Sequence, residues 1–374
     1  MKFRKFTNLF SLLIVCLFAF IAISCKEENS SPTAPQNKIL NAETIEKLQT
    51  AADKIMMNKQ TPGIMAYISV EGEGELYITR GVSNLVTSEP MNVNAYFRIG
   101  SITKTFTSEA VLILADEDRI DLDISISSYL PDLKIPSGDK ITIRMLGNMT
   151  SGLFDYTSDM NFWNALNNSN GQAIFTPEQL LDIAFTHPIQ FEPGTKYNYC
   201  NTNYILLGLL IKKVTGKEVV DVFNEKMFQP LGMKNTLWPN ISYLPYPYNH
   251  GYVSLVDVTN WSPSGGGAAG ILISNFSDLK IWAKELNERN LLSNKMKNER
   301  IAWIATTFPG FDSGFGLEKY SDWVGKDGSI PGYNAEVWYY PSKKITMIIN
   351  SNSWDGDPAL TTFFSFVDIL TPTK

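Results

Sequence analysis

The sequence is poor in histidine and cysteine, with two histidines and three cysteines among 374 residues. So few histidines argue against a histidine-based metal site, and they leave only His187 and His250 for a Ser-His-Asp arrangement. The motifs G-x-S-x-G, H-E-x-x-H, C-x-x-C and the P-loop are also absent from the sequence. No metal and no organic cofactor are therefore expected.

The three cysteines exclude a disulfide framework. Cys16 lies in the apolar N-terminal run and Cys25 directly follows it, which leaves Cys200 alone in the remaining chain. A lone cysteine is a candidate nucleophile, although a small buried apolar residue is the more common role. Stability is then expected to come from core burial.

Basic stretches are absent beyond residue 5. The formal net charge is −6 and becomes −9 without the three N-terminal cations. An acidic chain of this kind binds nucleic acid poorly, so no nucleic-acid partner is expected. Hydrophobic residues make up 44% and charged residues 19%, which is ordinary globular usage and predicts one large domain or two packed subdomains.

The N-terminus has the pattern of an export signal. Residues 1–24 carry cations and then an apolar run, and Ala22-Ile23-Ser24-Cys25 resembles a bacterial lipoprotein box. We expect a signal peptide over 1–24, lipid on Cys25 and a flexible tether over 25–39. The alternative is an uncleaved membrane anchor. The expected location is the bacterial cell envelope, on a membrane-anchored lipoprotein that faces the periplasm or the exterior.

The remaining chain, residues 40–374, is predicted to be one α/β (α+β) domain. Apolar spacing predicts helices over 40–58, from 103 onward, and over 177–185, 205–216 and 358–370. Alternating or short apolar runs predict strands at 64–70, 75–82, 336–341 and 345–352. This order predicts an antiparallel sheet from both chain ends, flanked by helices, with a helical subdomain inserted at about 120–275.

Because the G-x-S-x-G motif is absent, a catalytic serine in this sequence needs a base other than histidine. Lysine in the motif S-x-x-K is the known substitute. The motif occurs at Ser101, Ser137 and Ser277. Ser137 lies in a turn, and Ser277 is expected to be a helix N-cap. Ser101 opens a buried apolar helix, on which Lys104 would lie beside it. The structural alternative is an N-terminal turn with Lys104 extended to water.

Two further short motifs occur once each. Tyr199-Cys200-Asn201 precedes an apolar helix, and Lys326-Asp327-Gly328 precedes a predicted strand. A second ammonium group near Lys104 would lower the pKa of that lysine toward neutrality. Taken singly, each motif could equally be an ordinary surface loop.

The three motifs in this order resemble the penicillin-recognising serine hydrolases: class C β-lactamases and D-alanyl-D-alanine carboxypeptidases. The similarity extends over about residues 40–370 and includes FRIGSITKTFT, EPGTKYNYCNTNYILLG and GKDGSIPGYNAEVW. It implies the β-lactamase/transpeptidase-like fold, with the active site between the sheet and the helical subdomain. By this resemblance Ser101 is the acylated nucleophile, with Lys104 and Tyr199 as candidate proton acceptors.

The resemblance also assigns the substrate-binding groups. Asn201 would orient the substrate, and Lys326 would supply positive charge. Gly328 would let a substrate lie close to the backbone. The backbone N–H groups of Ser101 and Ser329 would form an oxyanion hole.

Three positions depart from the usual family pattern. Asp327 stands where threonine often helps to bind a substrate carboxylate, so it would repel that group unless it points away or pairs with a cation. Cys200 replaces a serine and is expected to point away from the site. Asn148 stands where a histidine is common.

The expected activity is that of a serine-type D-Ala-D-Ala carboxypeptidase that forms an acyl-enzyme on peptidoglycan-type peptides. The alternatives are a class C-like β-lactamase, an esterase or D-amino-acid amidase, and a non-catalytic member of the fold. The expected partners are a small peptide, β-lactam or ester substrate and, through the lipid, a membrane.

Overall fold

The computed structural model describes residues 38–57, 60–240 and 242–372. The predicted signal peptide, Cys25 and the tether as far as residue 37 lie outside the described residues. Within those described ranges, no helix combines the length and apolarity needed to cross a membrane.

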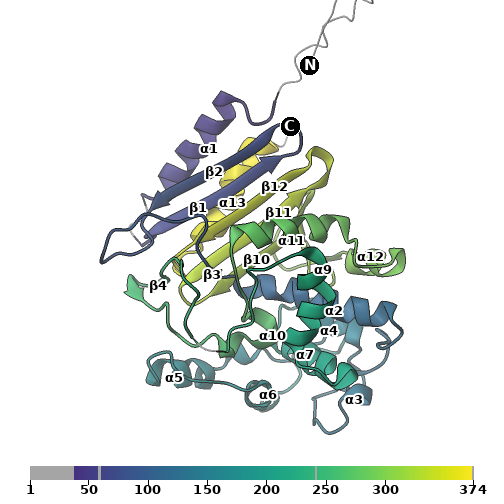
Figure 1. Ribbon diagram of the computed structural model, residues 1–374. Coiled ribbons are helices and arrows are strands. Elements are labelled where there is room, and N and C mark those ends of the chain that lie inside the picture. Colours follow the sequence, from purple (N-terminus) through teal and green to yellow (C-terminus); the bar gives the residue numbers. More distant parts are fainter. Residues whose placement is uncertain (1–37, 58–59, 241, 373–374) are drawn as a thin grey trace, which may run out of the picture. The chain divides into compact units, whose positions relative to one another are not determined.

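An antiparallel sheet of eight strands organises the fold, in the order β2-β1-β12-β11-β10-β9-β8-β7 (Figure 1). Strand β1 from the start of the chain pairs with β12 from its end, which confirms the predicted sheet built from both chain ends. The strands are β1 (Gly63–Val70), β2 (Gly74–Gly81), β7 (Ile304–Ala305), β8 (Phe311–Ser313), β9 (Glu318–Tyr320), β10 (Trp323–Ile330), β11 (Tyr333–Tyr340) and β12 (Ile345–Ser351).

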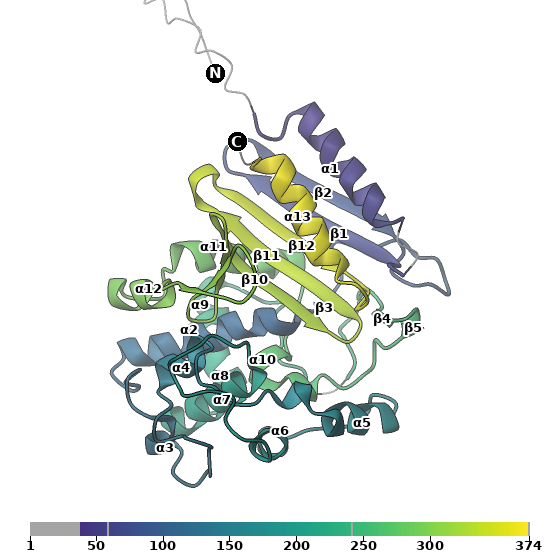
Figure 2. The ribbon, with the colours of Figure 1, turned by 180° about the vertical axis from the view of Figure 1, so that it is seen from behind.

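Two helices cover one face of the sheet. Helices α1 (Ala42–Ile55) and α13 (Pro358–Leu370) lie side by side across this face (Figure 2). Apolar side chains from both helices and from the strands form a separate core, in which the Trp338 and Phe363 rings stack at 4.6 Å. Asn41 caps α1 and Asp357 caps α13, each by accepting a backbone N–H of the first turn.

The other face carries the larger core and most helices. They lie between β3 (Phe97–Arg98) and β7 in sequence, where β3 pairs with β6 (Ile273–Ser274) and β4 (Tyr252–Val253) pairs with β5 (Val256–Asp257). The helices are α2 (Thr103–Asp116), α3 (Ile126–Tyr129), α4 (Ile143–Gly147), α5 (Met160–Asn168), α6 (Pro177–Phe185), α7 (Asn201–Thr215), α8 (Val219–Phe223), α9 (Gln229–Leu231), α10 (Gly267–Gly270), α11 (Phe276–Glu288) and α12 (Asn294–Arg300). The boundaries of the helical subdomain stay a prediction.

The structure corrects two local expectations. Lys326 precedes β11, which overlaps the strand predicted at 336–341, but Lys326 itself lies in a further strand, β10, that was not predicted. This strand is hard to predict because Gly325 and Gly328 have low strand propensity and Lys326 and Asp327 break the apolar alternation. Ser277 is not an N-cap, because Asn275 caps α11 by accepting the Asp278 N–H.

Candidate active site

Ser101 lies in a short 3-10 turn (Gly100–Ile102) that leads directly into α2. Every residue of α2 from Thr103 to Ala115 is buried, so the helix runs through the larger core. The Phe106 ring stacks on Trp282 at 3.8 Å. This burial fixes the first turn of α2, and therefore also the position of Ser101 at the edge of the core.

Lys104 lies one helical turn after Ser101, and its side chain is fully buried. Its Nζ atom is 3.0 Å from Ser101 Oγ, 2.7 Å from Asn201 Oδ1 and 2.8 Å from the Ala269 carbonyl oxygen. Burial and then the charge of Lys326 lower the pKa of Lys104 to about 7. Lys104 therefore reaches Ser101 and can lose its proton near neutral pH, and it does not extend to water.

Tyr199 approaches Ser101 from the loop before α7. Its hydroxyl donates a hydrogen bond to Ser101 Oγ at 2.7 Å. The two ammonium groups of Lys104 and Lys326 lie 4.9 Å and 5.3 Å from the centre of the tyrosine ring. Even so, burial raises the pKa of Tyr199 well above its ordinary value, and Lys326 only partly opposes this shift. Tyr199 is thus a hydrogen-bond donor at neutral pH.

Asn201 begins α7 and connects Lys104 to the loop before α5. While Oδ1 accepts from Lys104, Nδ2 donates to Asp155 Oδ2 at 2.9 Å and to Thr157 Oγ1 at 3.3 Å. Both ends of the Asn201 amide are therefore engaged within the protein. Asp155, which sequence reasoning missed, fixes the orientation of this amide.

The ammonium group of Lys326 lies between two carboxyl groups. Its Nζ atom is 2.6 Å from Glu318 Oε1 of the neighbouring strand β9, and it also contacts Asp327. Burial would lower the pKa of Lys326, but the charges of Asp327 and Glu318 outweigh it and raise that pKa. Burial also raises the pKa of Glu318 to about 8, and Lys326 partly opposes this shift. Lys326 is therefore a cation whose charge is already balanced.

Strand β10 packs directly against the turn that carries Ser101. A Cβ atom on Gly100 would lie 2.7 Å from Ser329 N, and one on Gly328 would lie 2.0 Å from the Ile99 carbonyl oxygen. Glycine is required at both positions, and Ile99 rather than a substrate makes the predicted close approach at Gly328.

The backbone of Ser329 lies where β10 packs against the turn that carries Ser101. The Ile330–Tyr333 pair closes a two-residue turn, so by the alternation of antiparallel ladders the next pair, Ser329–Asn334, exchanges no backbone hydrogen bonds. The Ser329 N–H therefore points away from β11, toward the edge of β10 beside Gly100. This direction fits the predicted oxyanion hole.

A cavity of about 600 Å³ opens beside Ser101. Tyr199, Asn201, Asp327 and Ser329 also line it, together with Asp357 at the start of α13. Its aromatic lining consists of Phe162, Trp163, Trp261, Phe308, Phe311 and Trp354, besides tyrosines. Burial and then the charge of Asp327 raise the pKa of Asp357 to about 6. The cavity thus combines an apolar wall with several carboxyl groups, in the size range of ligand pockets.

The other candidate residues lie elsewhere or are inert. Ser137 and Ser277 do not line the cavity. The Cys200 side chain is buried, contacts the Leu153 carbonyl oxygen at 3.4 Å and has a pKa raised by burial to about 12. Asn148 accepts a local hydrogen bond from Thr150.

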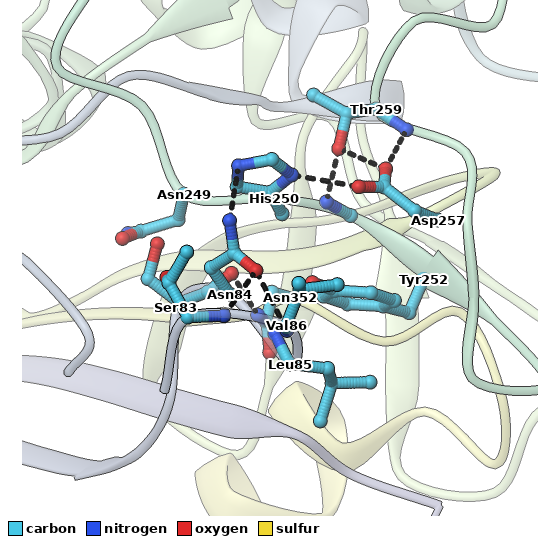
Figure 3. Close-up of polar contacts among 12 residues, drawn as sticks. Ser83, Asn84, Leu85, Val86, Asn249, His250, Tyr252, Asp257, Thr259 and Asn352 are labelled. Carbon is cyan, nitrogen blue, oxygen red and sulfur yellow. Dashed lines mark hydrogen bonds and ion pairs between the residues drawn. The ribbon is translucent and has the colours of Figure 1, made fainter. Parts of the chain in front are cut away.

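Neither histidine takes part in the site. His187 pairs with Asp159, and His250 pairs with Asp257 and Asn84 in the cluster of Figure 3. Across the described residues, no group of three or more His, Cys, Asp or Glu side chains is placed to hold a metal ion.

Sequence reasoning missed Glu318, Asp357 and Trp354, which reach the cavity from outside the three motifs. Glu318 lies eight residues before Lys326, and only the pairing of β9 with β10 sets Glu318 opposite Gly325 and beside the lysine. No short motif marks such a cross-strand neighbour. Asp357 could have been flagged as a helix cap, although not as a cavity residue.

The chain is similar to several known proteins over most of its length. A family model described as "Beta-lactamase" matches residues 44–363. The chain is 26% identical to a D-aminopeptidase of Brucella anthropi over 328 residues, which is 83% of this chain but only 59% of that protein. It is 26% identical to penicillin-binding protein 4* of Bacillus subtilis, covering 82% of this chain and 71% of that protein.

A solved structure extends the similarity to the fold. The D-stereospecific amidohydrolase of a Streptomyces species superposes with a TM-score of 0.79 at 28% identity, covering 88% of this chain and 99% of that chain. The sheet and its flanking helices are therefore similar to those of a protein named as a D-stereospecific amidohydrolase.

Proposed function

The chain belongs to the beta-lactamase family, and from this premise we propose that it is a serine hydrolase that forms an acyl-enzyme on Ser101. One observation carries the proposal: Ser101 Oγ lies between Lys104 Nζ at 3.0 Å and the Tyr199 hydroxyl at 2.7 Å. A nucleophile within hydrogen-bond reach of a base is the arrangement that covalent catalysis needs. These intact contacts argue against a non-catalytic member of the fold.

In the acylation step, neutral Lys104 takes the proton of Ser101 as its Oγ atom attacks the substrate carbonyl. A neutral amine donates two hydrogens, here to Asn201 Oδ1 and the Ala269 carbonyl oxygen, so its lone pair faces the Ser101 hydroxyl. The pKa of Lys104, about 7, suits a base at neutral pH, whereas the raised pKa of Tyr199 does not.

The remaining steps need a proton donor and an oxyanion hole. The backbone N–H groups of Ser101 and Ser329 would stabilise the oxygen of the tetrahedral intermediate. When the bond to the leaving group breaks, that group takes a proton from the Tyr199 hydroxyl, which recovers one from Lys104. Water then attacks the ester on Ser101 while Lys104 accepts a proton from it. When the ester bond breaks, Lys104 returns this proton to Ser101 Oγ, and the acid product leaves.

The proposed substrate is an amide or ester of a D-amino acid that carries no carboxylate beside Lys326. The Lys326 charge is already shared by Glu318 and Asp327, and Asp357 adds a third carboxyl group to the same cavity. A substrate carboxylate would meet repulsion there, while a neutral or ammonium group would not. The names of the D-aminopeptidase and the D-stereospecific amidohydrolase support this choice.

The D-Ala-D-Ala carboxypeptidase and β-lactamase functions form the second candidate. The similarity to penicillin-binding protein 4* favours it, and so does the position of Lys326, whose ammonium group lies 5.3 Å from the centre of the Tyr199 ring. Both functions need Lys326 to bind a substrate carboxylate, which would have to displace Glu318 or Asp327.

Covalent labelling tests the proposal. A fluorophosphonate probe is expected to label the wild-type protein and the Ser137→Ala and Ser277→Ala variants, but not Ser101→Ala. Turnover of a D-amino acid p-nitroanilide, compared with release of D-Ala from a peptide ending in D-Ala-D-Ala, separates the two candidates. Labelling that survives in Ser101→Ala would refute the nucleophile, and preferred turnover of the carboxylate peptide would favour the second candidate.

The proposal includes the cell envelope as the place of action. The signal pattern of residues 1–24 and the lipoprotein-like box at Cys25 support it. A lipid on Cys25 and the tether that follows would hold the enzyme at a membrane surface, next to peptide or ester substrates of the envelope.

A further inference from the structure

Two indole rings that line the cavity beside Ser101 pack against each other. Trp163 belongs to α5 on the helical side, and Trp354 belongs to the segment between β12 and α13 on the sheet side. Their ring centres are 5.6 Å apart with the planes at 36°, and both side chains line the cavity and are partly exposed. This pair therefore joins the two walls of the cavity near its surface.

The N–H group of each indole donates a hydrogen bond to a residue that lines the cavity beside Ser101. The Trp354 Nε1–H donates to Ser329 Oγ at 2.9 Å, and Ser329 carries a backbone N–H of the proposed oxyanion hole. The Trp163 Nε1–H donates to the Thr157 carbonyl oxygen at 2.8 Å. The Thr157 hydroxyl in turn accepts from Asn201. The positions of the two rings are thus tied to the groups that surround Ser101.

The segment that carries Trp354 is anchored by hydrogen bonds around Tyr252 and Asn352, two residues that are labelled in Figure 3. Tyr252 N–H donates to the Asn352 carbonyl oxygen at 3.1 Å, and Trp354 N–H donates to the Tyr252 carbonyl oxygen at 3.0 Å. The Tyr252 hydroxyl accepts from Leu85 N at 2.9 Å, and Asn352 Nδ2 donates to the Val82 carbonyl oxygen at 3.1 Å. These hydrogen bonds therefore fix the backbone of the segment that carries Trp354.

We propose that Trp163 and Trp354 form a clamp that selects the acyl part of the substrate by its side chain, favouring a bulky apolar group over a methyl group. This inference rests on the proposed function and names the substrate class that the site takes. The aromatic wall behind the clamp, with Phe162 and Trp261, gives such a group a surface to bury. A D-alanyl methyl group would leave most of this apolar surface in contact with water.

The clamp is tested with p-nitroanilides of D-Phe and D-Ala, using the ratio of their kcat/KM values as selectivity. Trp354→Ala and Trp163→Ala are each expected to lower this ratio about tenfold, chiefly through a higher KM for D-Phe, because an aromatic contact is lost. Trp354→Phe keeps a ring but has no N–H donor, and it is expected to retain most of the selectivity. The double variant should lose little more than either single variant, since the two rings act as one unit.

Trp238→Ala is the matched control, because Trp238 is also partly buried but packs on Phe223 outside the cavity. Its selectivity should equal that of the wild type. An unchanged ratio in Trp354→Ala and Trp163→Ala, or an equal fall in Trp354→Phe or Trp238→Ala, would overturn the clamp.

Rates are normalised to the fraction of protein labelled by the fluorophosphonate, so partly unfolded variants are corrected. A wild-type protein that is not labelled on Ser101 refutes the proposed function itself. A labelled wild type without preference for D-Phe refutes the clamp alone.

Discussion

Lys104 Nζ lies 3.0 Å from Ser101 Oγ inside the larger core, one helical turn along α2. A lysine at such a position is costly when charged, because burial removes its hydration. Three oxygen atoms surround it, and the nearby Lys326 disfavours its protonated form. Lys104 can therefore lose its proton near neutral pH and act as the base for Ser101.

The rate of acylation should rise with pH through the pKa of Lys104. Only the neutral amine can accept the Ser101 proton, so kcat/KM for a neutral substrate should be lost as the pH falls below about 7. Lys326→Met removes a positive charge that lowers the pKa of Lys104, and it should move this acidic limb to higher pH. The measurement is kcat/KM against pH for both proteins. An acidic limb that stays in place would mean that Lys104 does not govern the step.

Asp327 is predicted to exclude carboxylate substrates. Asp327→Thr removes the carboxylate of Asp327, which contacts Lys326, and so frees the lysine charge. KM for peptides ending in a free D-Ala carboxylate, and for penicillins, should fall by about tenfold, which corresponds to roughly 1.4 kcal/mol. KM for neutral esters should stay nearly constant and serves as the control. If KM stays unchanged for both substrate types, Asp327 has no part in substrate recognition.

The buried ion pair of Glu109 and Arg300 is predicted to stabilise α2, the helix that directly follows Ser101. Both side chains are fully buried, and Arg300 also donates to the Thr105 carbonyl oxygen of α2 at 3.0 Å. Glu109→Met leaves the guanidinium without its partner and should lower the free energy of unfolding by about 3–5 kcal/mol. Chemical denaturation measures this change.

The matched control is the double replacement Glu109→Met/Arg300→Met. It removes both charges, so it should cost less than Glu109→Met alone. Equal losses in the two variants would show that the pair adds nothing beyond packing.

Cys25 is predicted to carry the lipid that anchors the protein. The wild-type protein should partition into detergent, and mass spectrometry should find a lipid on Cys25. Cys25→Ala should be released or remain unprocessed. An unmodified N-terminus at another residue would contradict lipidation, and a retained segment 1–24 would indicate an uncleaved anchor instead.

Much of the fold could be predicted from local sequence patterns. Apolar spacing located α1, α6 and α13 to within a few residues, because the buried face of an amphipathic helix appears in the sequence as regularly spaced apolar residues. Strands β1 and β12 were predicted from a different pattern, because each is a short and nearly continuous apolar run. Strands β7–β10 were not predicted, because their sequences show little apolar alternation. Pairing with neighbouring strands stabilises them more than the strand propensity of their own residues does.

The sequence by itself determined the chemistry that the chain carries: a serine and a lysine one helical turn apart, a single Tyr-x-Asn and a single Lys-x-Gly, in an order typical of one family. Only the tertiary structure decided how these groups act. It buried Lys104, which lowers its pKa, and it set Glu318 beside Lys326 from another strand. It also brought Trp163 and Trp354 into contact in the lining of the cavity. Contacts between residues far apart in sequence depend on strand register and helix packing, which no local pattern encodes.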